Sequence, residues 1–153
     1  MGIEIERKFL VIGEAWKLHD AGEYISQGYL NRDPARTVRV RIKGEQAWLT
    51  VKGQSIGASR AEFEYAVPLR DAEQMLALCD GPRVEKIRRH VPFAGMNWEL
   101  DEFLGDNAGL VVAEIELSSP DQQFDLPPWL GQEVTEETRY FNSQLATHPF
   151  SSW

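Results

Sequence analysis

The first eleven residues, Met1-Gly-Ile-Glu-Ile-Glu-Arg-Lys-Phe-Leu-Val11, largely alternate between apolar and charged side chains. In a β-strand, a period of two places Glu4, Glu6 and Lys8 on one face and mainly apolar residues on the other. Neighbouring carboxylates repel each other, so the charged face needs a compensating cation. Two interpretations are open here. The charged face lies in water, or it is a carboxylate pair for a divalent metal with a lysine beside it for an anion.

Length and composition restrict the classes of protein that this chain can represent. Its 153 residues are 42% hydrophobic and 26% charged, which suits one globular domain over residues 1–153. The net charge of −8 argues against binding to nucleic acid or to an acidic membrane, and no apolar run reaches the roughly 18–20 residues of a membrane helix. The single cysteine, Cys79, excludes an internal disulfide, and the charged N-terminus does not resemble a signal peptide. We therefore expect a cytoplasmic protein.

The alternation of the first strand recurs along the chain between short turns. Further strands are predicted over residues 23–31, 37–43, 46–52, 60–67, 83–92, 97–103 and 110–118. Helices are predicted over residues 13–20, over residues 71–80 with Asp71 and Gln74 as a capping pair, and near the C-terminus with Thr135 as the cap. The predicted fold is mainly β with a few helices (α+β), an eight-stranded antiparallel barrel that is closed or nearly closed.

Charged residues of the same sign recur two positions apart on most of these strands. They are Glu4 and Glu6 with Lys8, Arg39 and Arg41, Lys52, Glu62 and Glu64, Lys86 and Arg88, Glu99 and Asp101, and Glu114 and Glu116. Period two does not decide whether this face lies inside the barrel or in water. Like-charged neighbours are destabilising unless a ligand relieves them. Carboxylate pairs suit Mg²⁺ or Mn²⁺, and arginine or lysine pairs suit phosphate oxygens. The pattern is therefore compatible with a site for a metal and a polyphosphate.

Other common sites find little support in the sequence. His19, His90 and His148 do not have the spacing of zinc ligands, and a single cysteine cannot complete such a set. There is no glycine-rich phosphate loop, so phosphate would be bound by side chains. No convincing Ser/His/Asp set is present.

With these residues in place, the chain resembles the CYTH domain, or triphosphate tunnel metalloenzyme, superfamily. The E-x-E-x-K signature is matched by Glu4, Glu6 and Lys8, and the resemblance continues through Ser26-Gln-Gly-Tyr-Leu30 to Glu114-Ile-Glu116. The C-terminal residues Glu133-Val-Thr135, Arg139-Tyr140 and Asn142 are similar to those of the small bacterial members. The resemblance implies an eight-stranded antiparallel barrel with a charged lumen, and hence apolar strand faces that point outward.

The resemblance also implies roles for individual residues. The implied metal ligands are Glu4, Glu6, Glu114 and Glu116, and the implied phosphate-binding residues are Lys8, Arg39, Arg41, Lys52, Lys86 and Arg88. Glu62, Glu64, Glu99 and Asp101 would place water or a second metal. Tyr29 and Lys8 are the candidate catalytic residues. Tyr29 would accept a proton if nearby cations favoured its phenolate, and a packing or lid role is the alternative.

The expected function is hydrolysis of inorganic triphosphate to pyrophosphate and phosphate with Mg²⁺ or Mn²⁺. Its partner would be a small-molecule triphosphate, with no nucleic acid and no membrane, and a homodimer is compatible with the family. Thiamine triphosphatase and class IV-type adenylate cyclase are alternatives within the enzyme class. A non-catalytic polyphosphate or nucleotide sensor and a lipocalin-like carrier of an apolar ligand are alternatives outside it.

Overall fold

The computed structural model describes residues 2–18 and 20–153, so Met1 and His19 lie outside the described residues. Within these residues a nine-stranded sheet is accompanied by short helices. The strands are β1 (Ile3–Val11), β2 (Glu23–Asn31), β3 (Arg36–Lys43), β4 (Gln46–Gly53), β5 (Ser59–Val67), β6 (Val84–Phe93), β7 (Met96–Phe103), β8 (Val111–Glu116) and β9 (Leu130–Glu133). The α-helices are α1 (Leu69–Ala77) and α2 (Asn142–Leu145), and single 3₁₀ turns are η1 (Ala15–Leu18), η2 (Gly105–Asn107), η3 (Thr138–Tyr140) and η4 (Phe150–Ser152).

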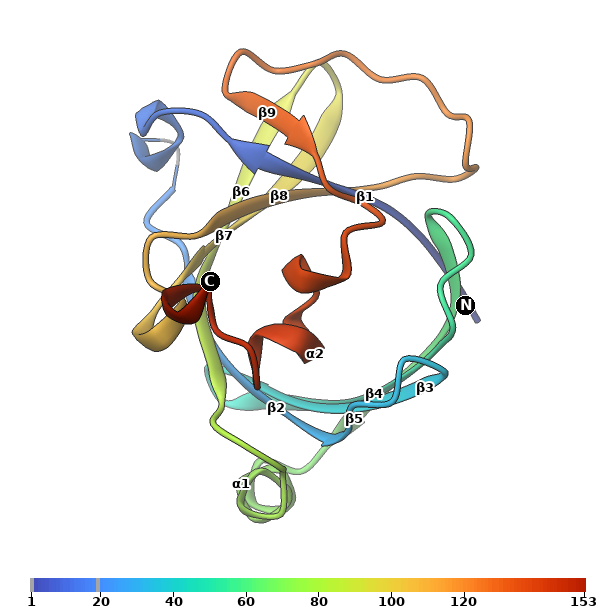
Figure 1. Ribbon diagram of the computed structural model, residues 1–153, viewed down its shortest axis with the longest axis vertical. Coiled ribbons are helices and arrows are strands. Elements are labelled where there is room, and N and C mark those ends of the chain that lie inside the picture. Colours follow the sequence, from blue (N-terminus) through green and yellow to red (C-terminus); the bar gives the residue numbers. More distant parts are fainter. Residues whose placement is uncertain (1, 19) are drawn as a thin grey trace.

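Strands β1 to β8 close into an antiparallel barrel, as predicted (Figure 1). Two meanders, β2–β5 and β6–β8, are joined by the pairing of β2 with β6, and β1 closes the ring between β5 and β8. Consecutive strands are therefore not always neighbours, because α1 returns the chain from β5 to the far side of β2. The hairpins between neighbouring strands are closed by tight turns. In the predicted turn between β6 and β7, Ala94 and Gly95 both adopt the positive φ that a two-residue type I′ turn requires.

The ninth strand was not predicted, since Leu130-Gly-Gln-Glu133 is short and carries no alternating pattern. It pairs with the end of β1, beyond the point where β5 leaves that edge. The chain after β9 continues this contact through a side chain, because the Lys8 amide donates to Thr135 Oγ1 at 3.0 Å. The prediction that Thr135 caps a helix is therefore wrong, and α2 begins seven residues later after Phe141.

The other predicted helices differ in their bounds. Helix α1 begins at Leu69, with Pro68 at its N-cap and no side-chain cap, so the predicted cap at Asp71 is wrong. The Pro68 carbonyl accepts the Ala72 amide, which starts the helix earlier than the capping pattern indicated. The helix predicted over residues 13–20 is reduced to the single turn η1, and its penultimate residue, His19, lies outside the described residues.

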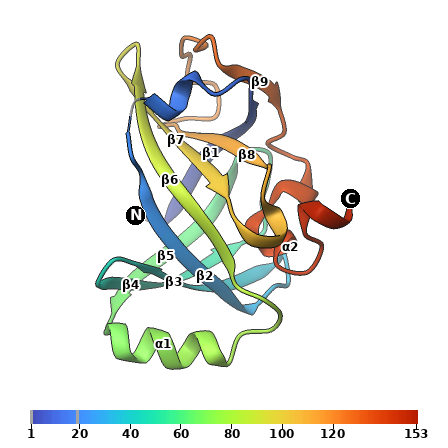
Figure 2. The same ribbon diagram turned by 90° about the vertical axis from the view of Figure 1, so that its left-hand side faces the viewer.

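The apolar faces of the strands point outward and are covered there. Trp98, which is fully buried, lies in edge-to-face contact with Phe9, Phe124 and Trp129, so the segment after β8 covers the outside of β1, β7 and β8. Helix α1 covers β2, β3 and β4 on another part of the outer surface (Figure 2). The charged faces therefore line the lumen of the barrel. The alternative interpretation, in which the charged faces lie in water around an apolar interior, is wrong.

A third apolar cluster lies inside one end of the barrel. Val84, Phe103 and Val112 extend the inward faces of β6, β7 and β8, and Leu145 and Ala146 pack against them. In Figure 1, α2 lies within the ring of strands. The C-terminal segment therefore fills this end of the lumen and faces the charged residues farther along it.

Candidate functional site

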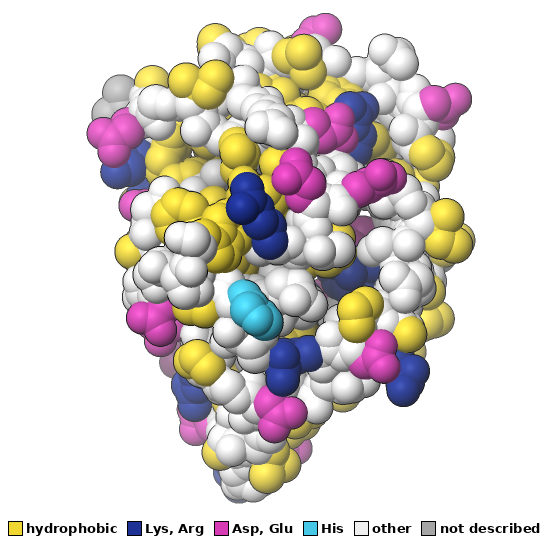
Figure 3. Space-filling view, viewed as in Figure 1, with side chains coloured by type: hydrophobic (Ala, Val, Ile, Leu, Met, Phe, Trp, Pro, Cys, Tyr) yellow, Lys and Arg dark blue, Asp and Glu magenta, His cyan; other side chains and the backbone are white. Residues whose placement is uncertain are grey.

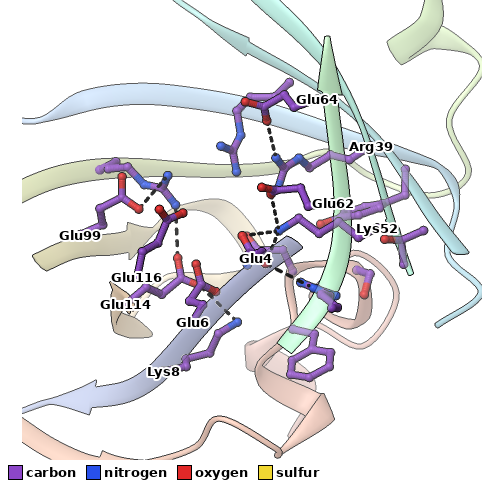
Figure 4. A pocket seen from close by; sticks show the side chains of 18 of the residues that line it. Glu4, Glu6, Lys8, Arg39, Lys52, Glu62, Glu64, Glu99, Glu114 and Glu116 are labelled. Atoms are coloured by element: carbon purple, nitrogen blue, oxygen red, sulfur yellow. Dashed lines mark hydrogen bonds and ion pairs between the residues drawn. The ribbon is translucent and has the colours of Figure 1, made fainter. Parts of the chain in front are cut away.

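The inward faces of the strands enclose a cavity of about 220 Å³, which we call the lumen cavity. All the residues predicted for the site line it except Asp101. Its lining is Glu4, Glu6, Lys8, Tyr29, Thr37, Arg39, Arg41, Lys52, Arg60, Glu62, Glu64, Lys86, Arg88, Glu99, Glu114, Glu116, Phe141, Asn142 and Ser143. In Figure 4 the labelled acidic and basic side chains converge from several strands, and ion pairs connect many of them.

Three carboxylates form an acidic cluster at one side of the cavity. Glu4, Glu6 and Glu116 each place one oxygen within 4.8 Å of the others. Strand pairing explains this, because Glu6 on β1 lies directly opposite Glu116 on β8. Burial, followed by the charges of Glu114 and Glu4, raises the pKa of Glu6 well above its ordinary value. Burial and the nearby carboxylates also raise the pKa of Glu116. The repulsion and the oxygen donors fit a hard divalent cation.

Glu4 differs from the other two members of the acidic cluster because it has cationic partners. Lys52 Nζ lies 3.1 Å from both of its oxygens, and Arg60 Nε lies 3.4 Å from one. Burial would raise the pKa of Glu4, but the charges of Lys52 and Arg60 outweigh it and lower the pKa. Glu4 thus links the acidic cluster to the basic side of the cavity.

Glu114, the fourth predicted metal ligand, lies between two cations. Its carboxylate is 3.3 Å from Lys8 Nζ and 3.3 Å from Arg88. These charges lower its pKa well below the ordinary value although burial opposes them. In this structure Glu114 orients Lys8 and Arg88, and the Lys8–Glu114 pair lies two residue pairs along the β1–β8 ladder from the Glu6–Glu116 pair.

Asp101 occupies a different environment from the other predicted acidic residues. It is 1% exposed, and its two oxygens are bound by Lys86 Nζ at 2.7 Å and by Arg88 Nε at 2.8 Å. Burial alone would raise its pKa, but the charges of Arg88 and Lys86 lower it to about 2. Both oxygens are engaged in a buried ion pair, and Asp101 is not part of the cavity lining, so its role in placing water or a second metal stays a prediction.

The remaining acidic candidates each contact a phosphate-binding candidate. Glu62 lies 3.5 Å from Lys52, Glu64 lies 3.4 Å from Arg39, and Glu99 lies 3.5 Å from Arg88. Burial and the charge of Glu4 raise the pKa of Glu62. These three carboxylates remain at the cavity wall.

The basic side of the lumen is formed by four crowded side chains on β3 and β6, which are Arg39, Arg41, Lys86 and Arg88. Burial, then the charges of Arg39 and Arg88, lowers the pKa of Arg41 to about 9. Burial also disfavours the charged ammonium group of Lys86, and it lowers the pKa of Lys86 to about 7. The Nε of Arg39 is buried without a hydrogen-bond partner among the described residues. A polyanion would relieve the repulsion between these cations and supply the missing acceptor.

Tyr29 lies where the charged lumen meets the apolar cluster at the C-terminal segment. It is 5% exposed, packs in that cluster, and also lines the cavity. In the β2–β3 ladder it is directly opposite Arg39. Its position is compatible with both interpretations offered above, a catalytic and a packing role.

Five residues that line the lumen cavity were not predicted as site residues from the sequence. Arg60 continues the period-two series of Glu62 and Glu64 on β5, so the alternation could have identified it. Thr37 likewise precedes Arg39 on β3. Phe141, Asn142 and Ser143 belong to the C-terminal segment, where no periodic pattern indicates a site.

Comparison with known proteins agrees with this geometry. The family model described as the CYTH domain matches residues 2–148. The chain belongs to the CYTH domain family. This CYTH chain is 47% identical to an inorganic triphosphatase of Acetivibrio thermocellus, over 100% of this chain and 99% of that protein. It is 39% identical to an inorganic triphosphatase of Nitrosomonas europaea, over 94% of this chain and 96% of that protein.

Solved structures support the same family fold. An inorganic triphosphatase structure has a TM-score of 0.65 at 35% identity, over 93% of this chain and 96% of that chain. A Hippeastrum protein assigned as an adenylyl cyclase, with a dominant triphosphatase activity, has a TM-score of 0.57 at 12% identity, over 79% of this chain and 81% of that chain. The second similarity concerns the fold alone. CYTH membership and the acidic cluster imply a divalent metal.

Among the described residues, no helix has the length and hydropathy to cross a membrane. On the face shown in Figure 3, basic side chains are interspersed with acidic and neutral ones. By contrast, charged side chains make up most of the lining of the lumen cavity.

Proposed function

We infer that this chain is a metal-dependent hydrolase that cleaves inorganic triphosphate to pyrophosphate and phosphate inside the barrel. The observation that carries this is the cavity itself, in which three converging carboxylates face a crowded group of buried cations. Relatives of 47% and 39% identity carry the name inorganic triphosphatase. The cavity of about 220 Å³ is smaller than the 300–1,000 Å³ or so of pockets for drug-sized ligands, which favours a compact inorganic substrate.

The basic residues would bind and align the triphosphate. Arg39, Arg41 and Arg88 offer planar groups for phosphate oxygens, and Lys8, Lys52 and Lys86 offer point charges. Because these groups are held by ion pairs and strand packing before substrate arrives, they need little reorganisation. Water then attacks a terminal phosphorus, the bridging P–O bond breaks, and pyrophosphate leaves.

The acidic cluster is the proposed metal site. Glu4, Glu6 and Glu116 would hold Mg²⁺ or Mn²⁺, which would neutralise charge on the phosphate oxygens. Glu62, Glu64 and Glu99 remain candidates for placing water or a second metal, whereas we assign Asp101 to the ion pair with Lys86 and Arg88.

The candidate catalytic residues keep distinct roles in this proposal. Lys8, held by Glu114 next to the acidic cluster, would stabilise charge that develops on phosphate oxygens. Tyr29 is the proposed proton acceptor, because it lines the lumen cavity and lies opposite Arg39 in the β2–β3 ladder.

A panel of substrates tests the function. With Mg²⁺ or Mn²⁺, inorganic triphosphate should be cleaved faster than ATP or thiamine triphosphate, and chelation by EDTA should reduce phosphate release to background. Phosphate release and cyclic AMP are measured in parallel. Formation of cyclic AMP from ATP, or failure to cleave inorganic triphosphate, would contradict the proposal, and binding without turnover would favour a sensor.

A second cavity is the reason for including organic triphosphates. It measures about 330 Å³ and shares four lining residues with the lumen cavity, which are Thr37, Arg60, Phe141 and Ser143. Apart from Arg60 and Glu136, its lining is uncharged and includes Ser55, Thr138 and Gln144, so an organic group attached to a triphosphate could extend into it. This favours thiamine triphosphatase or a nucleotide-specific enzyme as the second candidate function.

Replacing Arg41 by alanine should weaken triphosphate binding by about 10- to 100-fold, because a charge-assisted hydrogen bond contributes about 1.5–3 kcal/mol. Metal binding should change little, since Arg41 is not part of the acidic cluster. Isothermal titration calorimetry with triphosphate and, separately, with Mn²⁺ measures the two affinities. Equal loss of both would show that Arg41 acts through the fold of the whole site.

The cellular setting is proposed from the composition, and the oligomeric state from the family resemblance. We propose a cytoplasmic enzyme with a small-molecule substrate, and a homodimer that sedimentation at several protein concentrations would detect.

A further inference from the structure

Asn142, at the start of α2, brings the C-terminal segment into contact with the basic side of the lumen. The next turn of this segment is fixed by packing, because Leu145 and Ala146 are buried against the apolar cluster at the end of the barrel. Figure 1 shows α2 inside the ring of strands. The side chain of Asn142 is thus presented to the lumen from a segment far from the barrel strands in the sequence.

The carboxamide oxygen of Asn142 has two partners. It accepts from Lys86 Nζ at 3.0 Å and from Gln27 Nε2 at 3.0 Å. Gln27 is fully buried, and its own oxygen accepts from Arg41 Nε at 2.9 Å. One oxygen atom therefore holds Lys86 directly and holds Arg41 through a single amide.

This network also fixes the orientation of the Asn142 carboxamide. A lysine ammonium group can only donate, so the oxygen and not the NH₂ group must face Lys86. No hydrogen bond among the described residues uses Asn142 Nδ2, although Asn142 lines the lumen cavity. The NH₂ group is therefore available as a neutral donor to an anion in the cavity.

We propose that Asn142 is a positioning residue for the triphosphate, which aligns Lys86 and, through Gln27, Arg41. The proposal rests on the proposed function and adds to it that the C-terminal segment is a working part of the substrate site. A purely structural role, in which Asn142 only attaches α2 to the barrel, is the competing explanation.

The test is a double-mutant cycle on triphosphate affinity, measured by isothermal titration calorimetry without metal so that turnover does not interfere. Asn142→Ala should raise the Kd of inorganic triphosphate about tenfold. In the Arg41→Ala background the same change should have a smaller effect, of less than about threefold, because one of the two cations that Asn142 positions is gone and only Lys86 remains. In the Arg39→Ala background, Asn142→Ala should keep its full effect, since Arg39 contacts Thr50 and Glu64 rather than this network.

Two further variants control for folding. Gln27→Met is close in volume, cuts the path to Arg41, leaves the Asn142–Lys86 contact, and should reproduce the non-additivity with Arg41→Ala. Leu145→Ala should lower the thermal stability of the C-terminal segment without that non-additivity. The proposal is wrong if Asn142→Ala changes the Kd by less than twofold, or if its effect multiplies fully with that of Arg41→Ala.

The wild-type protein separates this proposal from the function on which it rests. Binding of triphosphate without cleavage would contradict the triphosphatase proposal. The double-mutant cycle on Kd would still test the role of Asn142, because it does not depend on turnover. Absence of triphosphate binding by the wild-type protein would overturn both.

Discussion

Replacing Glu116 by glutamine is expected to lower the kcat of metal-dependent triphosphate hydrolysis by on the order of 100-fold or more. The substitution keeps the size of the side chain but removes one charged oxygen donor from the acidic cluster. Glu116 is the clearest choice in that cluster, because Glu4 is also bound to Lys52 and Arg60. Turnover at saturating triphosphate, over a range of Mg²⁺ and Mn²⁺ concentrations, measures the effect.

Stability distinguishes loss of the metal from damage to the fold. Because burial and the neighbouring carboxylates raise the pKa of Glu116, its charge opposes folding when no metal is bound. The metal-free Glu116→Gln protein should therefore have a Tm equal to or above that of the wild type, and the rise in Tm on adding Mn²⁺ should shrink. Glu73→Gln, on the exposed face of α1, is the matched control and should preserve turnover. Wild-type kcat in Glu116→Gln would contradict the metal assignment.

Replacing Asp101 by asparagine is expected to lower the free energy of unfolding by about 3–5 kcal/mol, because it removes the buried counter-charge that Lys86 and Arg88 share. Arg88 keeps its contacts with Glu99 and Glu114, whereas Lys86 loses its ion pair. The side chain keeps its volume, so packing alone would not explain such a loss. Urea unfolding of the metal-free protein at pH 7 measures the difference. Glu102→Gln, on the next residue, removes a partly exposed partner of Arg89 and should cost less than about 1 kcal/mol.

The pH dependence of stability has a defined sign at Asp101. Its folded pKa of about 2 lies below the ordinary value of 3.8, so the charged form is favoured by folding. This contribution of roughly 2–3 kcal/mol is complete above about pH 5 and is lost as the pH falls from about 4 towards 2. The wild type should therefore lose more stability over that interval than Asp101→Asn does. Unchanged stability together with lost metal-dependent turnover would instead favour the second-metal role.

The strands could be predicted because their signal is local. In residues 37–43 and 46–52 the alternation of apolar and charged side chains follows directly from the geometry of a strand, and both segments form strands with nearly those bounds. The short strand β9 and the start of α1 could not be predicted in this way. β9 depends on an edge of β1 that becomes available only after folding, and α1 starts from the carbonyl of Pro68.

The sequence predicted which residues belong to the candidate site better than it predicted which of them contact one another. The pattern of paired charges identified Glu6 and Glu116, but their contact depends on the β1–β8 register. The same register places Glu114 between Lys8 and Arg88. Asp101 has the same local pattern as Glu99, yet it is buried in an ion pair while Glu99 lines the cavity. Local sequence does not report such differences in depth.

The sequence by itself determined that strands would form, which residues would share a strand face, and which family the E-x-E-x-K residues resemble. Tertiary structure decided which face lies inside, because a period of two is the same whichever side is buried. It also brought Glu4 and Glu6 to Glu116 by closing the barrel, and it placed Asn142 against Lys86. These contacts join residues more than fifty positions apart, so they follow from the closed path of the chain and not from any local pattern.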